Sequence, residues 1–503
     1  MATSYGCGFQ ATAVLNRALL WGAMAEQGEV HEKLEGHDTK EHKISFHEED
    51  RHVKKESLLN EDQAVAVPLK KPVRIATLDV FRGLTVALMV LVDDAGGEWP
   101  RINHSPWNGC TLADLVMPFF LFIVGVAIAL ALKRIPDQVA ATQKVVIRTL
   151  KLLFWGLLLQ GGFSHAPDDL SYGVDMRKIR WCGILQRIAF GYLIVALVEI
   201  ATTKSRSLEL PKGQFGIFKL YKWHWACALA VVIIYHSVAY GLYVPDWHFI
   251  DSGHRFVVQC GVRGDIGPAC NAVGHIDRTI LGINHLYQSP EWTRTQSCDL
   301  DSPAEGDPPA NAPAWCKAPF EPEGILSSIS AILSCIIGIH YGHVLIHFKG
   351  HMKRVLHWTI PAAALLVLAT ILHFTHAIPL NKQLYSFSYV CFTAGAAGMI
   401  FSLLYVVIDI FGINQPTLIF QWMGLNAMFV FVMAASGIAA AFVNGWYWHD
   451  PSNNLVNWIK KHVFVNVWHS QRVGTLLYVL IAEILFWGLV SGILHWRGIY
   501  WKL

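Results

Sequence analysis

The sequence of 503 residues is poor in charge. Only 15% of its residues are Asp, Glu, Lys or Arg, and 40 basic against 37 acidic residues leave a net charge of +3. Soluble domains carry about 25% charged residues. The small net charge argues against a nucleic-acid-binding protein, and a hydrophobic content of 53% excludes a disordered chain. The composition therefore predicts a polytopic membrane protein that contacts membrane lipid and does not bind nucleic acid.

The chain also lacks the alternation of apolar and polar residues that is typical of a transmembrane β-strand. Continuous apolar runs such as 119–132 and 362–372 indicate helices instead. A bilayer core needs about 20 mostly apolar residues per helix. Ten stretches meet this length: 76–94, 112–132, 145–164, 181–201, 223–243, 324–346, 357–378, 384–410, 417–441 and 474–495. We predict an all-α membrane protein, a polytopic bundle of about ten transmembrane helices.

Lys and Arg residues gather on alternate sides of successive predicted spans, and the side that is rich in them faces the cytosol. They flank the spans at 70–74, 133–151, 204–222, 349–354 and 497–502. Lys460, Lys461 and Arg472 lie on the other side, in a loop that disagrees with this orientation. Four loops agree with it, so we keep it. This pattern predicts cytosolic N- and C-termini and an extracytoplasmic loop at 244–323.

The polar N-terminal part is predicted to be separate from the membrane domain. Residues 26–72 are rich in Glu, Lys and His and have few aromatic residues, which is typical of disorder. We predict a disordered cytosolic tail over 1–73 and a transmembrane domain over 74–503. Met24 lies where this polar tail begins. Our hypothesis is therefore that residues 1–23 belong to an alternative start of the chain.

Four of the ten cysteines, Cys260, Cys270, Cys298 and Cys316, lie in the 244–323 loop. An even set of cysteines in an extracytoplasmic loop predicts two disulfides, and four cysteines allow three connectivities. We favour pairing between neighbours, Cys260 with Cys270 and Cys298 with Cys316. A zinc site is the competing interpretation, but the loop has no closely spaced cysteine pair of the kind that structural zinc uses.

Ionisable residues inside spans are costly and are therefore candidates for function. Asp79 and Arg82 share one helical face at spacing i, i+3, and Arg187 has no partner in its own helix. His340, His343 and His347 also share a face, but no Glu or Cys nearby in the sequence completes a metal site. We interpret them as interfacial bases and predict no metal.

The densest polar segment runs from Asp93 to Asp114, DDAGGEWPRINHSPWNGCTLAD. His104 lies inside it, and histidine exchanges protons near neutral pH with the least retuning. A single histidine at a membrane edge is more often an ordinary interfacial residue. Carboxylates on both sides in sequence are able to orient an imidazole and hold its tautomer. Capping of the following helix is the alternative role of Asp114.

Three segments closely resemble a known family. They are residues 74–125, which contain DVFRG and HSPWNGCTLADLV, residues 183–189, GILQRIA, and residues 381–390, NKQLYSFSYV. The family is that of the heparan-α-glucosaminide N-acetyltransferases, whose plant-type members are most similar, and the resemblance covers residues 74–503. It implies a multi-span enzyme that moves acetyl from cytosolic acetyl-CoA to a glucosamine-type amine on the lumenal side. The chain departs from the animal enzyme in its polar N-terminal tail and in Asp93, where the animal enzyme has Asn.

The resemblance also implies residue roles. The family's catalytic histidine lies in the same H-x-x-W-N-G segment, which makes His104 the expected catalytic residue, held by Asp93 or Asp114. The anionic nucleotide of acetyl-CoA, the expected co-substrate, requires basic residues at the cytosolic side. The candidates for acceptor or thioester binding are Trp107, Asn108, Asn381 and Lys382, with a packed turn as the alternative for the first two, and those for acetyl-CoA are Arg82, Arg148, Lys151 and Arg187.

Two other functions fit the same sequence. One is an O-acetyltransferase of a glycan on the same fold, and the other is a solute transporter, because intramembrane charges also suit solute pathways. The motifs DVFRG and HSPWNG have no repeat in the second half, which argues against a transporter. Family analogy implies a homodimer and a lysosomal, vacuolar or Golgi membrane.

Overall fold

A computed structural model describes residues 75–501 except 134, 136, 161–175, 204–210, 212, 214–215, 252, 303–305, 436–438, 440–442 and 444. The side chains of residues 160 and 435 are also outside the description. The predicted tail over 1–73 and the alternative start over 1–23 lie outside the described residues.

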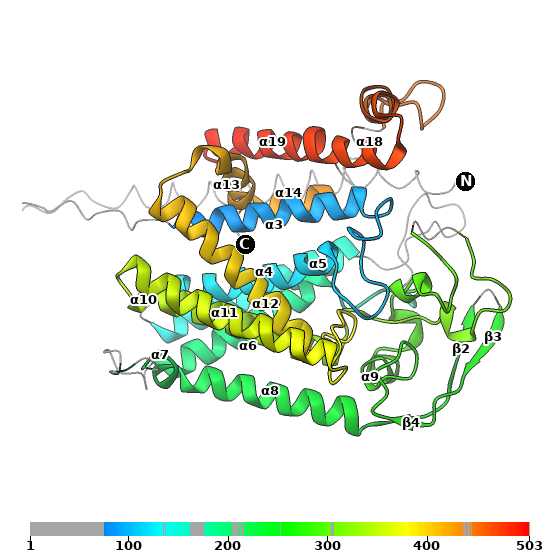
Figure 1. Cartoon of the computed structure of the whole chain (residues 1–503), viewed down its shortest axis with the longest axis horizontal. Coiled ribbons are helices and arrows are strands. Elements are labelled where there is room, and N and C mark those ends of the chain that lie inside the picture. The colour runs from blue at the N-terminus through cyan, green and yellow to red at the C-terminus, as the bar shows by residue number, and fades with distance from the viewer. Residues whose placement is uncertain are drawn as a thin grey trace, which may run out of the picture. The chain divides into compact units, whose positions relative to one another are not determined.

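The described chain is mainly helical (Figure 1). The long helices are α3 (Ala76–Ala95), α4 (Leu112–Leu132), α5 (Gln138–Gln160), α6 (Ile184–Thr203), α8 (Lys222–Gly241), α10 (Ile325–His347), α11 (His351–Phe374), α12 (Phe387–Tyr405) with its extension η4 (Val406–Ile410), and the run α18 (Gln471–Leu477), η7 (Tyr478–Glu483) and α19 (Ile484–Trp496). The shorter ones are α7 (Gly216–Leu220), η5 (Gln415–Thr417), α13 (Leu418–Leu425), α14 (Ala427–Ala435), α16 (Leu455–Ile459), η6 (Lys460–Val465) and α17 (Asn466–Trp468).

Each of the ten predicted spans contains helix, but fewer helices are long and apolar enough to cross a membrane. Seven of the described helices are: α4, α6, α8, α10, α11, the run 387–410 and the run 471–496. An eighth span is formed if the pair 415–425 and 427–434 counts as one, although it bends by 71°. The remaining two stretches, α3 and α5, are interrupted by charged residues. A count of about ten therefore stays a prediction.

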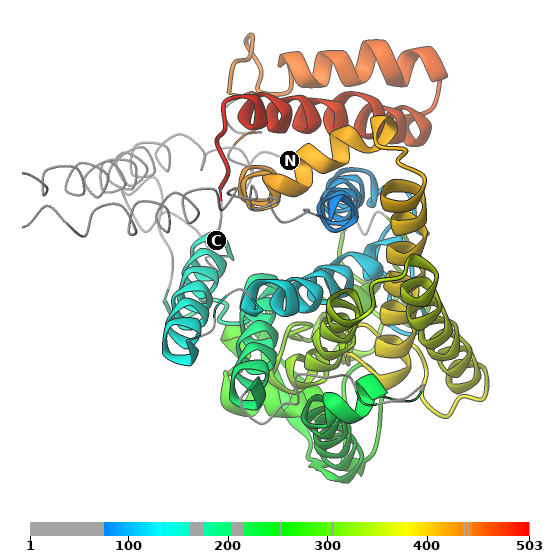
Figure 2. The ribbon, with the colours of Figure 1, turned by 90° about the vertical axis from the view of Figure 1, so that its left-hand side faces the viewer.

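Helices α4 and α10 pack against each other at the centre of the described unit. Their contact depends on glycine, because a Cβ on Gly125 would lie 2.2 Å from the carbonyl oxygen of Cys335 and a Cβ on Gly338 would lie 2.1 Å from that of Phe122. Small residues allow backbones in a membrane bundle to approach this closely. Figure 2 shows the C-terminal helices, drawn in orange and red, along the side of the bundle away from α8.

The 244–323 segment has its own small core. It contains two antiparallel two-stranded sheets, β1 (Tyr243–Val244) with β4 (Val262–Arg263) and, between them in the chain, the hairpin of β2 (Trp247–Asp251) with β3 (His254–Val258). Helix α9 (Ala272–Ile280) and three short turns, η1 (Ile283–His285), η2 (Glu291–Arg294) and η3 (Ala314–Lys317), follow. Disulfides join Cys260 to Cys270 and Cys298 to Cys316, which confirms the predicted pairing.

The aromatic residues of the 244–323 segment pack on the loop between α3 and α4. Trp107 of that loop lies in one buried cluster with Trp292 and Phe320, with ring centroids 5.5 and 5.9 Å away. The segment therefore covers the end of the bundle at which α3 ends and α4 begins, on the right in Figure 1. Helix α7 lies at the opposite end.

Candidate active site

The site is built on the turn into α4. Thr111 precedes the helix, and its backbone N–H and its hydroxyl both donate to Asp114 Oδ2, each at 3.0 Å. The sequence Thr-Leu-Ala-Asp is a recognisable helix start, because a carboxylate three residues after the cap satisfies amides that the helix leaves free. The loop 96–111 is thereby fixed to the rigid start of α4.

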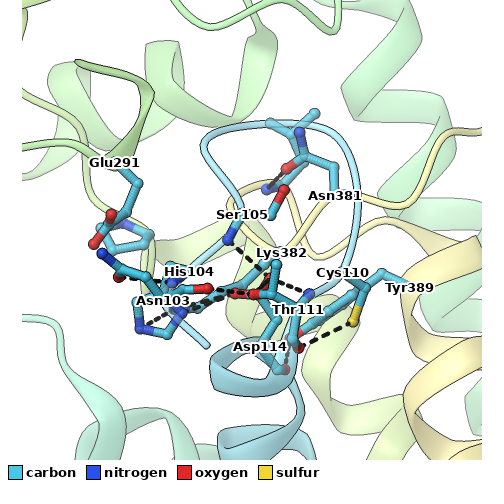
Figure 3. Close-up of polar contacts among 12 residues, drawn as sticks. Asn103, His104, Ser105, Cys110, Thr111, Asp114, Glu291, Asn381, Lys382 and Tyr389 are labelled. Atoms are coloured by element: carbon cyan, nitrogen blue, oxygen red, sulfur yellow. Dashed lines mark hydrogen bonds and ion pairs between the residues drawn. The ribbon is translucent and has the colours of Figure 1, made fainter. Parts of the chain in front are cut away.

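Asp114 also holds His104. The Nδ1 atom of His104 lies 2.8 Å from Asp114 Oδ1, and the backbone N–H of Ser105 donates to Asp114 Oδ2 at 3.1 Å (Figure 3). Asp114 is fully buried, whereas the His104 side chain is 27% exposed. A buried carboxylate that accepts from Nδ1–H leaves the lone pair on Nε2, so the nitrogen that Asp114 does not contact is the one that can take a proton.

Lys382 faces the same imidazole. Its ammonium nitrogen lies 3.0 Å from His104 Nδ1, 3.1 Å from Nε2 and 4.0 Å from Asp114 Oδ1. Both ring nitrogens are within hydrogen-bond distance of this ammonium. Lys382 therefore places positive charge beside the ring, and the ammonium must move away from Nε2 before Nε2 takes a proton.

Two residues that the sequence analysis did not identify complete the support of His104. Arg294 of η2 donates to the backbone carbonyl of His104 at 2.7 Å and pairs with Glu291. The hydroxyl of Tyr389, on α12, donates to the backbone carbonyl of Asp114. Both come from segments more than a hundred residues away in sequence, and no local spacing points to them.

Asp93, the other carboxylate that was predicted to hold His104, lies at the end of α3. Its side chain is exposed, and among the described residues its charge acts on Asp94, Lys382 and Glu483. No hydrogen bond joins Asp93 to His104 in the described chain. Of the two candidate carboxylates, Asp114 is thus the one in contact with the imidazole.

The predicted acceptor-binding residues are divided between packing and the site. Trp107 is 7% exposed, and its indole N–H donates to the carbonyl of Ile266 at 3.0 Å. Its position is that of a packed turn. Asn381 is buried, and its amide donates to Asn108 Oδ1 at 3.3 Å. This pair joins the His104 loop to the loop that carries Lys382, and only Asn108 is exposed.

The four predicted acetyl-CoA-binding residues are not gathered in one place. Arg82 on α3 contacts Asp79 at 3.5 Å and the carbonyl of Gly424 at 3.3 Å. The guanidinium of Arg148 lies 4.7 Å from the ring centre of Tyr192. Lys151, also on α5, is exposed. These three residues lie on α3 and α5.

The position predicted for Arg187 is wrong. Arg187 lies in the first turn of α6 and is 1% exposed. It donates to the carbonyl of Pro322 at 2.6 Å and to Ser327 Oγ at 2.5 Å. Pro322 closes the 244–323 segment, so Arg187 lies at the His104 end of the bundle and not at the opposite end. The predicted span 181–201 begins on the same side as this helix, so the expected cytosolic position of Arg187 did not follow from the span itself.

Cys110 is the one thiol beside His104 in the described site, and it is not a nucleophile. Burial and the neighbouring Asp114 carboxylate both raise the pKa of the Cys110 thiol far above its ordinary value. Only the thiolate attacks a thioester efficiently. The chemistry of the site therefore rests on the imidazole.

A buried carboxyl group, Asp277 on α9, makes the loop-covered end of the bundle sensitive to pH. Asp277 Oδ1 accepts from the backbone N–H of Ile325 at 2.8 Å, and Oδ2 has no hydrogen-bond partner among the described residues. Burial raises its pKa from 3.8 to about 7. The folded protein therefore binds this proton more tightly than the unfolded chain does.

The contribution of Asp277 to stability is full below its unfolded pKa of 3.8 and is lost as the pH rises through about 7. We expect the thermal midpoint of the purified protein to fall by roughly 2–4 °C between pH 5 and pH 7.5 through this group. Asp277→Asn keeps the acceptor for Ile325 and is expected to remove most of that difference. Asp246→Asn, at an exposed loop carboxylate, is the control. An unchanged pH difference in Asp277→Asn would contradict the assignment.

Comparison with known proteins identifies the family. Residues 74–212 match the family described as heparan-alpha-glucosaminide N-acetyltransferase, catalytic. The chain is 30% identical over 430 residues to the heparan-alpha-glucosaminide N-acetyltransferase of Mus musculus, which covers 82% of this chain and 59% of the mouse protein. It is 29% identical over 450 residues to the Homo sapiens protein of the same name, with 86% and 60% covered.

The chain thus spans about three-fifths of the length of these two relatives. The matched region of the family contains α3, the His104 loop, α4, α5 and α6, which carry His104 and Asp114. The motifs, the helical architecture and these similarities agree, and the chain belongs to the heparan-alpha-glucosaminide N-acetyltransferase family.

Proposed function

We propose that this protein is a membrane acetyltransferase that moves an acetyl group from acetyl-CoA to the amine of a glucosamine-type sugar. The observation that carries the proposal is the contact between His104 Nδ1 and the fully buried Asp114 carboxylate at 2.8 Å. A carboxylate–imidazole pair whose second nitrogen does not contact the carboxylate supplies a base for this reaction, because an ammonium group must lose a proton before it attacks a thioester.

In the proposed reaction, the sugar ammonium first releases one proton to solvent water, and Nε2 of His104 takes a second proton from the amine nitrogen as it attacks. The amine nitrogen forms a bond to the acetyl carbonyl carbon, the carbon–sulfur bond breaks, and CoA leaves as the thiolate, which receives the proton from the imidazolium. The alternative is that Nε2 first takes the acetyl group itself and then passes it to the amine. Both routes need the tautomer that Asp114 enforces.

Lys382 has a proposed role in either route. Attack on the thioester carbonyl puts negative charge on its oxygen, and a fixed positive group beside the reacting atom stabilises that charge. The Lys382 ammonium lies within 3.1 Å of both ring nitrogens and its side chain is 10% exposed. Asn108 lies in the same loop as His104, and its exposed side-chain amide carries a second donor.

Acetyl-CoA is proposed to enter from the cytosol, at the end of the bundle opposite His104. Arg82 and Lys151 are the remaining candidates for the nucleotide among the four predicted basic residues, since the Arg82 side chain is 28% exposed and Lys151 is also exposed. The acceptor is proposed to meet His104 on the lumenal side, below the disulfide-bonded segment 244–323. A lysosomal, vacuolar or Golgi membrane is part of the proposal by family analogy. A homodimer is part of the proposal by family analogy alone.

Asp114→Asn tests the tautomer directly. The carboxylate side that faces Ser105 and Thr111 accepts three hydrogen bonds, so the Asn carbonyl oxygen is expected there and its NH₂ group is expected against His104 Nδ1. The NH₂ group then donates to Nδ1, the proton moves to Nε2, and the base is lost. We expect kcat to fall by about 10²–10⁴-fold, with little change in KM for acetyl-CoA, in membranes supplied with labelled acetyl-CoA and glucosamine.

The matched control is Asp93→Asn, which removes a carboxylate from the same region without touching His104. We expect a change of less than a few-fold in kcat. If Asp93→Asn caused the large loss and Asp114→Asn did not, the assignment of Asp114 would be wrong. Labelled product on a hydroxyl group of the acceptor would instead indicate an O-acetyltransferase, and uptake of label without any free CoA would indicate a transporter.

A further inference from the structure

A second cluster of polar side chains lies at the other end of the bundle from His104. It consists of Glu199 near the end of α6, His224 near the start of α8 and His343 near the end of α10. Glu199 is twelve residues beyond Arg187 on α6, which is about 18 Å at the rise of an α-helix. In Figure 1 this end is marked by α7, away from the strands and α9. The cluster is therefore separate from the proposed active site.

The three side chains converge on one oxygen atom. Glu199 Oε2 lies 3.0 Å from His343 Nε2 and 3.0 Å from His224 Nε2. His224 does not meet hydrogen-bond geometry in this contact, and neither of its ring nitrogens has a hydrogen-bond partner among the described residues. All three are buried, with exposed fractions of 6%, 2% and 1% for Glu199, His224 and His343.

This arrangement has the geometry and the donor atoms of a metal site. One candidate ligand atom from each residue lies within 4.8 Å of the others. Zinc binds imidazole nitrogen and carboxylate oxygen at about 2.0–2.2 Å in a tetrahedron, so two of its ligands lie about 3.3 Å apart. The separations from Glu199 Oε2 to the two imidazole nitrogens, each 3.0 Å, are close to this ligand–ligand distance. Two neutral imidazoles and one carboxylate are a donor set that zinc and related first-row divalent cations prefer.

The surroundings hold the rings in place. The ring of Tyr221 stacks on His343 with a centroid separation of 3.4 Å, and its hydroxyl lies 2.9 Å from His347 Nε2. His340, one turn before His343, is also buried, and neither of its nitrogens has a hydrogen-bond partner in the described structure. Glu199 is the one carboxylate that contacts these imidazoles within the part of the chain described. Neutral imidazoles are the metal-binding form.

We propose that Glu199, His224 and His343 form a binding site for one divalent cation of the zinc type, which ties α6, α8 and α10 together. Because the three ligands are buried, the site has no access for a sugar or for CoA, and its role is structural. The interpretation of His340, His343 and His347 as interfacial bases without a carboxylate nearby is wrong for His343. Glu199 is 144 residues away in sequence, and only the packing of α6 on α10 brings it near.

Metal analysis of the full chain tests this proposal. The protein is purified in detergent with a tag that contains no histidine and without chelators, and bound metal is measured by mass spectrometry. We expect about one zinc per chain, and at least a tenfold lower content in His224→Ala and in Glu199→Gln. His236→Ala removes another histidine of α8, which contacts only the Val232 carbonyl among described hydrogen bonds, and is expected to keep the metal.

A spectroscopic measurement keeps the test independent of whether a variant folds. The wild-type protein is stripped with a chelator and loaded with Co²⁺, and we expect the visible absorption of a tetrahedral site and its loss when Zn²⁺ is added. Absence of zinc from the purified wild type together with no such absorption would overturn the proposal. So would equal zinc in His224→Ala, and the cluster would then be a histidine–glutamate–histidine network that shares protons.

Discussion

Replacing His104 with alanine is expected to lower the kcat of acetyl transfer by about 10²–10⁴-fold, which is what a positioned general base contributes. The reason is that His104 Nε2 is the ring nitrogen that Asp114 does not contact. Alanine removes the base and leaves Asp114 capped by Ser105 and Thr111, so the fold of the loop is expected to survive. The measurement is transfer of label from acetyl-CoA to glucosamine in membranes that contain equal amounts of each protein.

The matched control for His104→Ala is His376→Asn. His376 follows α11 on the same side of the molecule, is exposed, and has a φ of 56°, a left-handed conformation that Asn tolerates better than Ala. We expect wild-type activity from the control. If His104→Ala kept more than half of the wild-type kcat, His104 would not be the base.

Exchange of label between acetyl-CoA and free CoA in the absence of any acceptor distinguishes the two chemical routes. An acetyl-imidazole at His104 predicts exchange in the wild type and none in His104→Ala. Direct transfer predicts none in either protein. The result decides between the routes and does not affect the assignment of His104.

Replacing Gly83 with alanine is expected to prevent most molecules of the protein from folding. A Cβ on Gly83 would lie 1.7 Å from the carbonyl oxygen of Phe420, and a Cβ on Gly424 would lie 1.8 Å from that of Asp79. Both obstacles are backbone atoms of the facing helix, so no side-chain rotation relieves them. Overpacking of a core costs about 1–3 kcal/mol, and here α3 and α13 must separate as well.

We expect Gly83→Ala and Gly424→Ala each to reduce the monodisperse fraction in detergent, measured by size-exclusion chromatography, several-fold. Gly241→Ala is the control, because Gly241 lies at the end of α8 and nothing lies within 4 Å of its added Cβ. A Gly83→Ala protein with wild-type yield and thermal midpoint would show that the two helices do not cross as described.

The motif DVFRG illustrates what local sequence reveals. Its apolar neighbours and the Asp79–Arg82 spacing predicted a helix with both side chains on one face, and the structure has α3 with the two in contact at 3.5 Å. Nothing in the motif shows why Gly83 is a glycine. That follows only from the approach of α13, which is more than 300 residues away along the chain.

The active site likewise contains residues that are close together in the sequence and residues that only tertiary packing brings there. His104 and Asp114 lie within one loop and one helix turn, and the Thr-Leu-Ala-Asp start of α4 is legible from its spacing. Lys382, Arg294 and Tyr389 reach the same place from α12 and from distant loops. Their arrival depends on how the helices are rotated and stacked, which hydropathy does not encode.

The sequence by itself indicated the membrane class, the helical character and two disulfides in the 244–323 loop, because apolar run length and an even set of cysteines are properties of contiguous residues. His104 was identified through the resemblance of its segment to a known family. Only the tertiary structure decided which carboxylate lies against His104, which residues Arg187 contacts, and that Glu199 meets His224 and His343. Those outcomes depend on contacts between helices, and the crossing of two helices is set by side-chain and glycine packing along their whole length.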